Sequence, residues 1–159
     1  MSRFALIAVT ALVALLTLPS LALARPRLDG FERSVLRQVN QARAAQGLSK
    51  LSASRPLSRA ADTHSGDMLR SDFFDHASSD GTPFDRRVRR YADVGMVGET
   101  LASLPRRRGG AATIVQMWLD SPPHRAIVLH VDFERIGIGR RWGTLGATPN
   151  AVVTADFAS

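Results

Sequence analysis

The chain has 159 residues, which is enough for one domain of ordinary size, and it contains no cysteine, which excludes disulfides and a lipid-anchored lipoprotein. It is strongly basic, with 21 basic against 14 acidic residues and a formal net charge of +7. Such a balance favours association with anionic polymers or membrane surfaces, although the abundance of arginine is also consistent with genomic composition alone.

Residues 1–24 have the pattern of a cleavable secretory signal. Arg3 gives a short positive start, residues 4–18 are almost unbroken apolar sequence, and the small-x-small triplet Ala22-Leu23-Ala24 follows a proline break. We expect cleavage after Ala24, which leaves residues 25–159 as a single secreted or periplasmic domain without a membrane span. An uncleaved anchor is the alternative, because the run approaches the roughly 20 residues that a spanning helix needs. Predicted export argues against nucleic acid as a partner.

Apolar residues at helical spacing predict two long helices at the start of the exported part. The first begins at Asp29, a good N-cap, and ends near Gly47. A connecting loop, residues 48–54, leads to the second helix. Pro56 fits a first helical position of that helix, which ends near Ser71.

Shorter helical segments are predicted further along the chain. A third, short helix has Thr82 as its cap and Pro83 at its first position, and it carries an apolar stripe on one side and arginines, including Arg87, on the other. Residues 93–110 contain several glycines and a proline and are predicted to be irregular. A fourth helix over residues 111–119 is broken by two prolines, and a further helical turn covers residues 124–129.

The end of the chain changes from helical to alternating periodicity. Residues 136–141 predict a strand, residues 142–149 a turn-rich link, and residues 151–157 a second strand. We expect these strands to form an antiparallel hairpin. Helices first and a hairpin last indicate an α+β sandwich, not a doubly wound α/β fold.

Two of the four histidines are candidates for chemistry. His64 lies on the apolar face of the second helix, where a hydrogen-bonded core histidine is expected, and His130 is expected to be a surface or capping residue near Asp132. His76 and His124 lie next to turn-forming residues, which present side chains to clefts.

Glu99 stands in an apolar stretch, so it is expected to be buried and therefore paired or protonated. Two imidazoles and a carboxylate can bind a divalent metal with water at an open position, or can support acid–base chemistry. A buried network that only rigidifies the fold is the structural alternative. Ser121 precedes His124 by three residues, but the chain lacks a G-x-S-x-G elbow, which disfavours a serine nucleophile.

Seven sequence motifs occur in one order along the chain: Ala60–Met68, Phe73–His76, Asp80–Arg86, Gly98–Leu101, Trp118–Ala126, Ile136–Gly139 and Val153–Phe157. Together they resemble the bacterial SCP-like extracellular proteins of the CAP superfamily, relatives of the cysteine-rich secretory and plant pathogenesis-related proteins. The resemblance covers nearly all of the exported part, from about Phe31 to Phe157.

The resemblance implies a CAP-type α-β-α sandwich, with a small, mainly antiparallel sheet between helical layers and a surface cleft. His76 and His124 match the two cleft histidines, and Glu99 matches the glutamate of the G-E motif; in several relatives this site binds Zn²⁺ or another divalent cation. Thr100 and Ile127 replace asparagines of the family pattern, which removes two amides that could order the cleft.

The family does not supply one shared reaction, so function must be argued from the site. The first hypothesis is a secreted binding or interaction module for a divalent metal, a lipid or a cell-envelope ligand such as an anionic polymer. The alternative is a metal-assisted extracellular hydrolase, a peptidase or an esterase, with Glu99 and His124 as candidate catalytic residues. The sequence leaves open whether the protein is an enzyme and whether it forms an oligomer.

Overall fold

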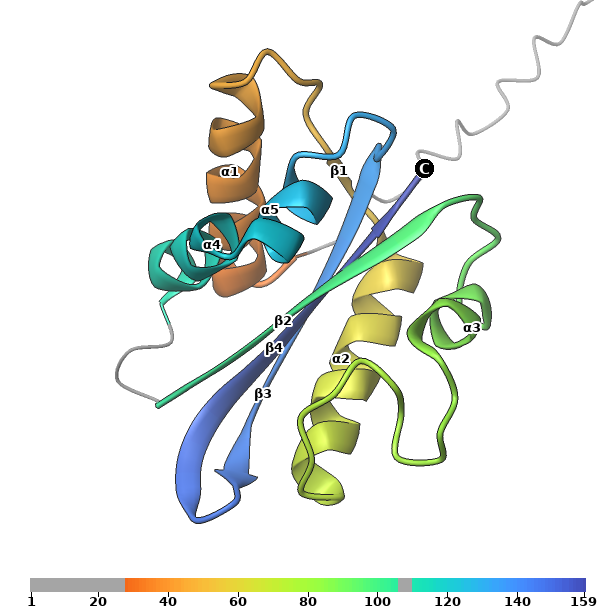
Figure 1. Ribbon diagram of the computed structural model, residues 1–159, viewed down its shortest axis with the longest axis vertical. Helices are drawn as coiled ribbons and strands as arrows, with labels where there is room; N and C mark the ends of the chain where they lie inside the picture. The colour runs from red at the N-terminus through yellow and green to blue at the C-terminus, as the bar shows by residue number, and fades with distance from the viewer. Residues whose placement is uncertain (1–27, 106–109) are drawn as a thin grey trace, which may run out of the picture.

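The protein is described by a computed structural model over residues 28–105 and 110–159, in which two layers of helices enclose one sheet (Figure 1). The predicted signal, residues 1–24, lies outside the described residues. Within the described ranges, no helix combines the length and the apolar character that a bilayer crossing needs.

Five helices form the two outer layers. Helices α1 (Gly30–Ala44), α4 (Ala111–Asp120) and α5 (Pro122–Val128) cover one face of the sheet, and α2 (Arg55–Arg70) and α3 (Phe84–Arg89) cover the other (Figure 1). All five correspond to the helices expected from apolar spacing. The start of α1 is fixed by a capping box, in which the side chains of Asp29 and Glu32 each accept a hydrogen bond from the other's backbone N–H.

The sheet has four strands, ordered β1 (Ser52–Ala53), β3 (Arg135–Leu145), β4 (Thr148–Ala158) and β2 (Val97–Pro105). Strand β1 runs parallel to β3, whereas the pairs β3–β4 and β4–β2 are antiparallel. The predicted hairpin is therefore confirmed as β3 and β4. The mainly antiparallel sheet between helical layers also confirms the predicted α-β-α sandwich.

Three predictions of irregular structure were wrong. The loop predicted over residues 48–54 contains the short strand β1. Residues 93–110 contain strand β2, which the expected alternation does not reveal because successive residues from Gly98 to Ala102 are all buried. Residues 142–149 continue the hairpin, since β3 reaches Leu145 and β4 already begins at Thr148. Only a two-residue turn remains between these strands, and Gly146 adopts a φ of 58° there, which suits glycine.

Helix α2 lies directly on the backbone of β3, because two glycines of this strand leave room for it. A Cβ atom on Gly137 would lie 2.1 Å from the backbone at Leu57 and Ser58. A Cβ atom on Gly139 would lie 2.1 Å from the backbone nitrogen of Asp62. The close contact fixes α2, and with it the start of the loop that carries His76, relative to the sheet.

Replacing Gly139 with alanine is expected to lower the free energy of unfolding by about 3 kcal/mol, because the new methyl group would overlap with helix backbone that has no room to move. The matched control is Gly143→Ala in the same strand, where the new Cβ would meet only the side chain of Leu69 at 3.1 Å. Urea denaturation of both variants measures the difference. Equal stabilities for the two variants would contradict the close α2–β3 contact.

Candidate functional site

The centre of the candidate site is Glu99, which lies on β2 at the edge of the sheet and is 1% exposed. Its Oε1 atom lies 2.8 Å from His76 Nδ1. Its Oε2 atom accepts a hydrogen bond from Arg87 Nη2 of α3. The buried carboxylate expected from the sequence is therefore present, and both of its oxygens have a partner.

Arg87 joins the parts of this site. Besides Glu99, its guanidinium donates through Nη1 to the backbone oxygen of His76 at 2.8 Å and to Ser78 Oγ at 3.2 Å. The sequence placed Arg87 on the polar side of its helix with the neighbouring arginines, but its side chain is only 5% exposed. These acceptors make burial of the cation tolerable, and they hold the loop that carries His76 against α3.

A second buried carboxyl group, Asp156, lies opposite Glu99 on the neighbouring strand β4. It receives no hydrogen bond from a donor among the described residues. Burial, followed by the nearby charge of Glu99, raises the pKa of Asp156 well above its ordinary value. Sequence analysis missed Asp156, although it carries the same signal as Glu99, namely one carboxylate in an apolar strand.

His124 approaches His76 from the opposite helical layer. Ser121, Pro122 and Pro123 end α4 and begin α5, which brings His124 to the first turn of α5. The ring centroids of His124 and His76 lie 6.5 Å apart. The site therefore lies across the edge of the sheet, with β2 between the two helical layers (Figure 1).

The pKa values of the two imidazoles are shifted in opposite directions. The hydrogen bond to Glu99 raises the pKa of His76 above its ordinary value. Burial, and to a lesser extent the charge of His76, lowers the pKa of His124. His76 is 47% exposed and His124 is half-buried, so both rings are accessible from solvent. Relative to a free imidazole, His76 is therefore shifted toward its protonated form and His124 toward its neutral form.

The sequence comparison with protein families decides the identity of the domain. The family described as CAP, the cysteine-rich secretory protein family, matches residues 36–153, about three quarters of the chain. This chain belongs to the CAP family. The match includes every residue of the His76, Glu99 and His124 site.

Two relatives of this CAP domain come from Bacillus subtilis (strain 168). One is named uncharacterized protein YkwD and is 31% identical over 112 residues, which are 70% of this chain and 42% of the relative. The other is named uncharacterized membrane protein YlbC and is 34% identical over 109 residues, 68% of this chain and 31% of the relative. The CAP domain thus spans less than half the length of each relative.

Solved structures share the fold. An extracellular protein containing an SCP domain from Bacillus anthracis has a TM-score of 0.69 at 23% identity, covering 81% of this chain and 40% of that protein. An outer surface protein from Borrelia burgdorferi has a TM-score of 0.65 at 19% identity, covering 84% of this chain and 98% of that protein. These likenesses show the CAP fold and do not bear on a shared activity.

The two departures from the family pattern have a structural basis in this CAP domain. Ile127 packs on Gly98, where an added Cβ would lie 3.0 Å from Ile127 Cγ2 and 2.8 Å from the ring of Phe133. Thr100 is fully buried, and its hydroxyl has no hydrogen-bond partner among the described residues. The side of β2 that faces α5 is therefore closed by apolar contact and not by an amide network.

The remaining histidines and Ser121 fill structural positions. His64 is fully buried and its Nε2 lies 2.9 Å from the backbone oxygen of Asp75, as expected for a core histidine. His130 Nδ1 accepts a hydrogen bond from the backbone N–H of Asp132 at 3.3 Å, which fits the predicted capping role. Ser121 links two helices, as the sequence indicates.

The possible metal donors of the site are the imidazoles of His76 and His124 and the carboxylate of Glu99. Within the described residues, no group of three His, Asp or Glu side chains is placed to hold an ion. Glu99 already accepts hydrogen bonds from His76 and Arg87. A role for all three residues as metal ligands stays a prediction of the sequence.

Proposed function

We propose that this CAP domain is an extracellular binding module whose cleft holds a divalent cation, such as Zn²⁺, between His76 and His124. The observation that supports this function is the 2.8 Å contact between His76 Nδ1 and Glu99, combined with the 6.5 Å separation of the two imidazoles. A carboxylate on Nδ1 fixes the tautomer and the orientation of a histidine, and it leaves Nε2 available to a metal.

The two rings fit such an ion after a small rotation of their side chains. Zn–N distances of about 2.0–2.1 Å in tetrahedral geometry correspond to ring centroids roughly 5 Å apart. The observed 6.5 Å is therefore slightly wide. In this proposal Glu99 orients His76, and Arg87 keeps the carboxylate in place. A bound cation would offer its remaining positions, as a Lewis acid, to oxygen atoms of a ligand.

The proposed place of action is outside the cytoplasm. Residues 1–24 have the pattern of a secretory signal, and two structural neighbours are named as extracellular and outer surface proteins. The net charge of +7 suits an anionic envelope polymer or lipid as the partner. The proposed location and the proposed anionic partner are both compatible with a binding module.

Metal analysis of the untagged protein tests this function. We expect about one equivalent of Zn²⁺ to bind after chelation and refeeding, with a rise in Tm. His124→Ala should remove this binding, whereas the control His130→Ala should keep it, because the side chain of His130 lies outside the cleft and contacts Asp132 and Phe133. Absence of retained metal, together with no effect of Zn²⁺ on Tm, would refute the proposal.

The affinity for Zn²⁺ should also rise between pH 5.5 and pH 8. The hydrogen bond to Glu99 raises the pKa of His76, so at low pH a proton occupies the nitrogen that the cation needs. Raising the pH removes this competition. Calorimetric titrations at both pH values measure the difference, and an affinity independent of pH would argue against His76 as a ligand.

A metal-assisted hydrolase is the second candidate, and the state of His124 favours it. Burial lowers the pKa of its imidazole. A neutral imidazole can accept a proton from a water molecule. A screen of peptide and ester substrates with and without Zn²⁺ tests this activity, and unchanged turnover in His124→Ala would exclude it.

A further inference from the structure

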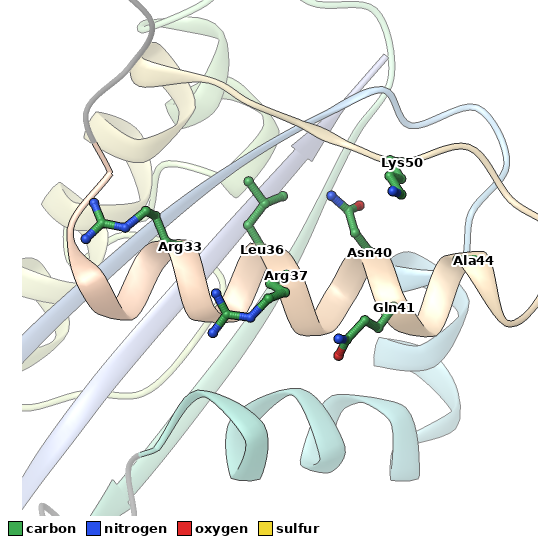
Figure 2. A pocket seen from close by; sticks show the side chains of 7 residues that line it. All are labelled: Arg33, Leu36, Arg37, Asn40, Gln41, Ala44 and Lys50. Carbon is green, nitrogen blue, oxygen red and sulfur yellow. The ribbon is translucent and has the colours of Figure 1, made fainter.

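A groove lies along helix α1, with its lining side chains shown in Figure 2. Its volume is about 580 Å³. Six of the lining residues come from α1 and one comes from the following loop: Arg33, Leu36, Arg37, Asn40, Gln41, Ala44 and Lys50. None of them belongs to the His76 and His124 cleft.

The polar lining of the groove is basic. It contains Arg33, Arg37 and Lys50, all exposed, and no carboxylate. None of the three forms an ion pair with a residue of the described ranges, whereas Arg87 and Arg141 do. The groove therefore presents a concentrated positive charge that the described part of the chain does not neutralise.

The position of Lys50 is fixed by the fold. Asn40 of α1 donates from its amide to the backbone oxygen of Leu51 at 3.0 Å and accepts from the Leu51 N–H at 2.8 Å. These two bonds fasten the loop to α1 one residue after Lys50. Arg33 and Arg37 lie one helical turn apart on α1, and Lys50 lies beside the C-terminal part of the same helix, so the three cations are spread along the groove (Figure 2).

We propose that this groove binds a linear polyanion that carries phosphate groups. Arginine forks match the oxygens of phosphate, and a line of cations fits successive charges along a chain. The apolar residues of the lining are Leu36 and Ala44. Large exposed apolar side chains such as Phe74 and Met96 lie outside it. This inference does not depend on the proposed cation site.

Long-chain inorganic polyphosphate is the probe, used with EDTA so that no metal contributes. The triple variant Arg33→Gln/Arg37→Gln/Lys50→Gln should bind polyphosphate at least tenfold more weakly. Its plot of log affinity against log salt should be less steep by about 2, since each lost phosphate contact removes roughly 0.7 from the slope.

The control variant Arg55→Gln/Arg59→Gln/Arg86→Gln loses the same charge at exposed positions on α2 and α3. It should lose less than threefold in affinity. Equal losses in the two triple variants would overturn the proposal, because binding would then follow net charge alone. Stronger binding to anionic phospholipid vesicles or to polyglutamate than to polyphosphate would overturn it as well.

The α1 groove and the proposed cation site can be tested independently of each other. His124→Ala should bind polyphosphate as the unmodified protein does, and the groove variant should bind Zn²⁺ normally. Loss of polyphosphate binding in His124→Ala would overturn the assignment to the α1 groove, whatever the outcome of the metal analysis.

Discussion

Replacing Glu99 with leucine is expected to lower the free energy of unfolding by about 3–5 kcal/mol at pH 5, because the variant leaves the buried cation of Arg87 without its anion. The side chain of Arg87 is 5% exposed and that of Glu99 is 0% exposed, so water offers little compensation. Urea denaturation in EDTA measures this change without interference from bound metal.

The cost of Glu99→Leu should shrink as the pH rises to 8.5. The hydrogen bond to Glu99 raises the pKa of His76, and the stability from this contact is present below the ordinary pKa and is lost as the pH rises through the folded value. Burial and Glu99 raise the pKa of Asp156, which costs the unmodified protein stability as the pH rises. Glu99→Leu lacks the charge of Glu99 and therefore avoids part of that cost. Both effects reduce the difference in the free energy of unfolding between Glu99→Leu and the unmodified protein.

The double variant Glu99→Leu/Arg87→Met is the control for charge. It removes the cation together with the anion and should recover most of the stability lost in the single variant, because apolar residues of similar volume can replace a buried ion pair. A single variant within 1 kcal/mol of the unmodified protein would contradict the structural importance of this pair.

Replacing Arg43 with alanine should lower the free energy of unfolding by about 4 kcal/mol, through lost hydrogen bonds and an unfilled cavity. Arg43 is fully buried on α1. It donates to four backbone oxygens, those of Ser49, Val128, His130 and Phe133. Three of these oxygens lie at or just after the end of α5, where a cation also stabilises the helix dipole.

Two control variants test whether the loss of stability in Arg43→Ala comes from the buried guanidinium. Arg43→Lys should recover only part of the stability, because an ammonium group does not reproduce the fork of a guanidinium. Arg37→Ala, an exposed position on the same helix, should change stability by less than about 0.5 kcal/mol. A change of similar size in Arg37→Ala and Arg43→Ala would show that burial of Arg43 is not the cause.

The helices could be predicted from the sequence because their apolar spacing and their caps agree. Asp29 and Pro56 mark helix starts by local chemistry alone, and the structure places helix starts beside both. Strand β2 could not be found in this way. Its central residues, including Glu99 and Thr100, are buried in succession, so neither alternation nor a purely apolar run marks the strand.

The candidate site was only partly predictable for a related reason. His76, Glu99 and His124 stand out as polar residues beside turns or within apolar sequence, and the structure places His76 in contact with Glu99 and near His124. No sequence feature distinguishes Arg87 from its neighbours, because it is one of four arginines in a short segment. Its burial depends on acceptors that only the tertiary structure brings together.

The order of the strands has a consequence for how the domain is made. Strand β4 comes last of the four along the chain, yet it lies between β3 and β2 and joins them. Strand β2, which carries Glu99, therefore cannot join the sheet until a segment more than 50 residues further along the chain has been synthesised. Pairings across such sequence distances form slowly, so the helical layers can be present before the cleft exists.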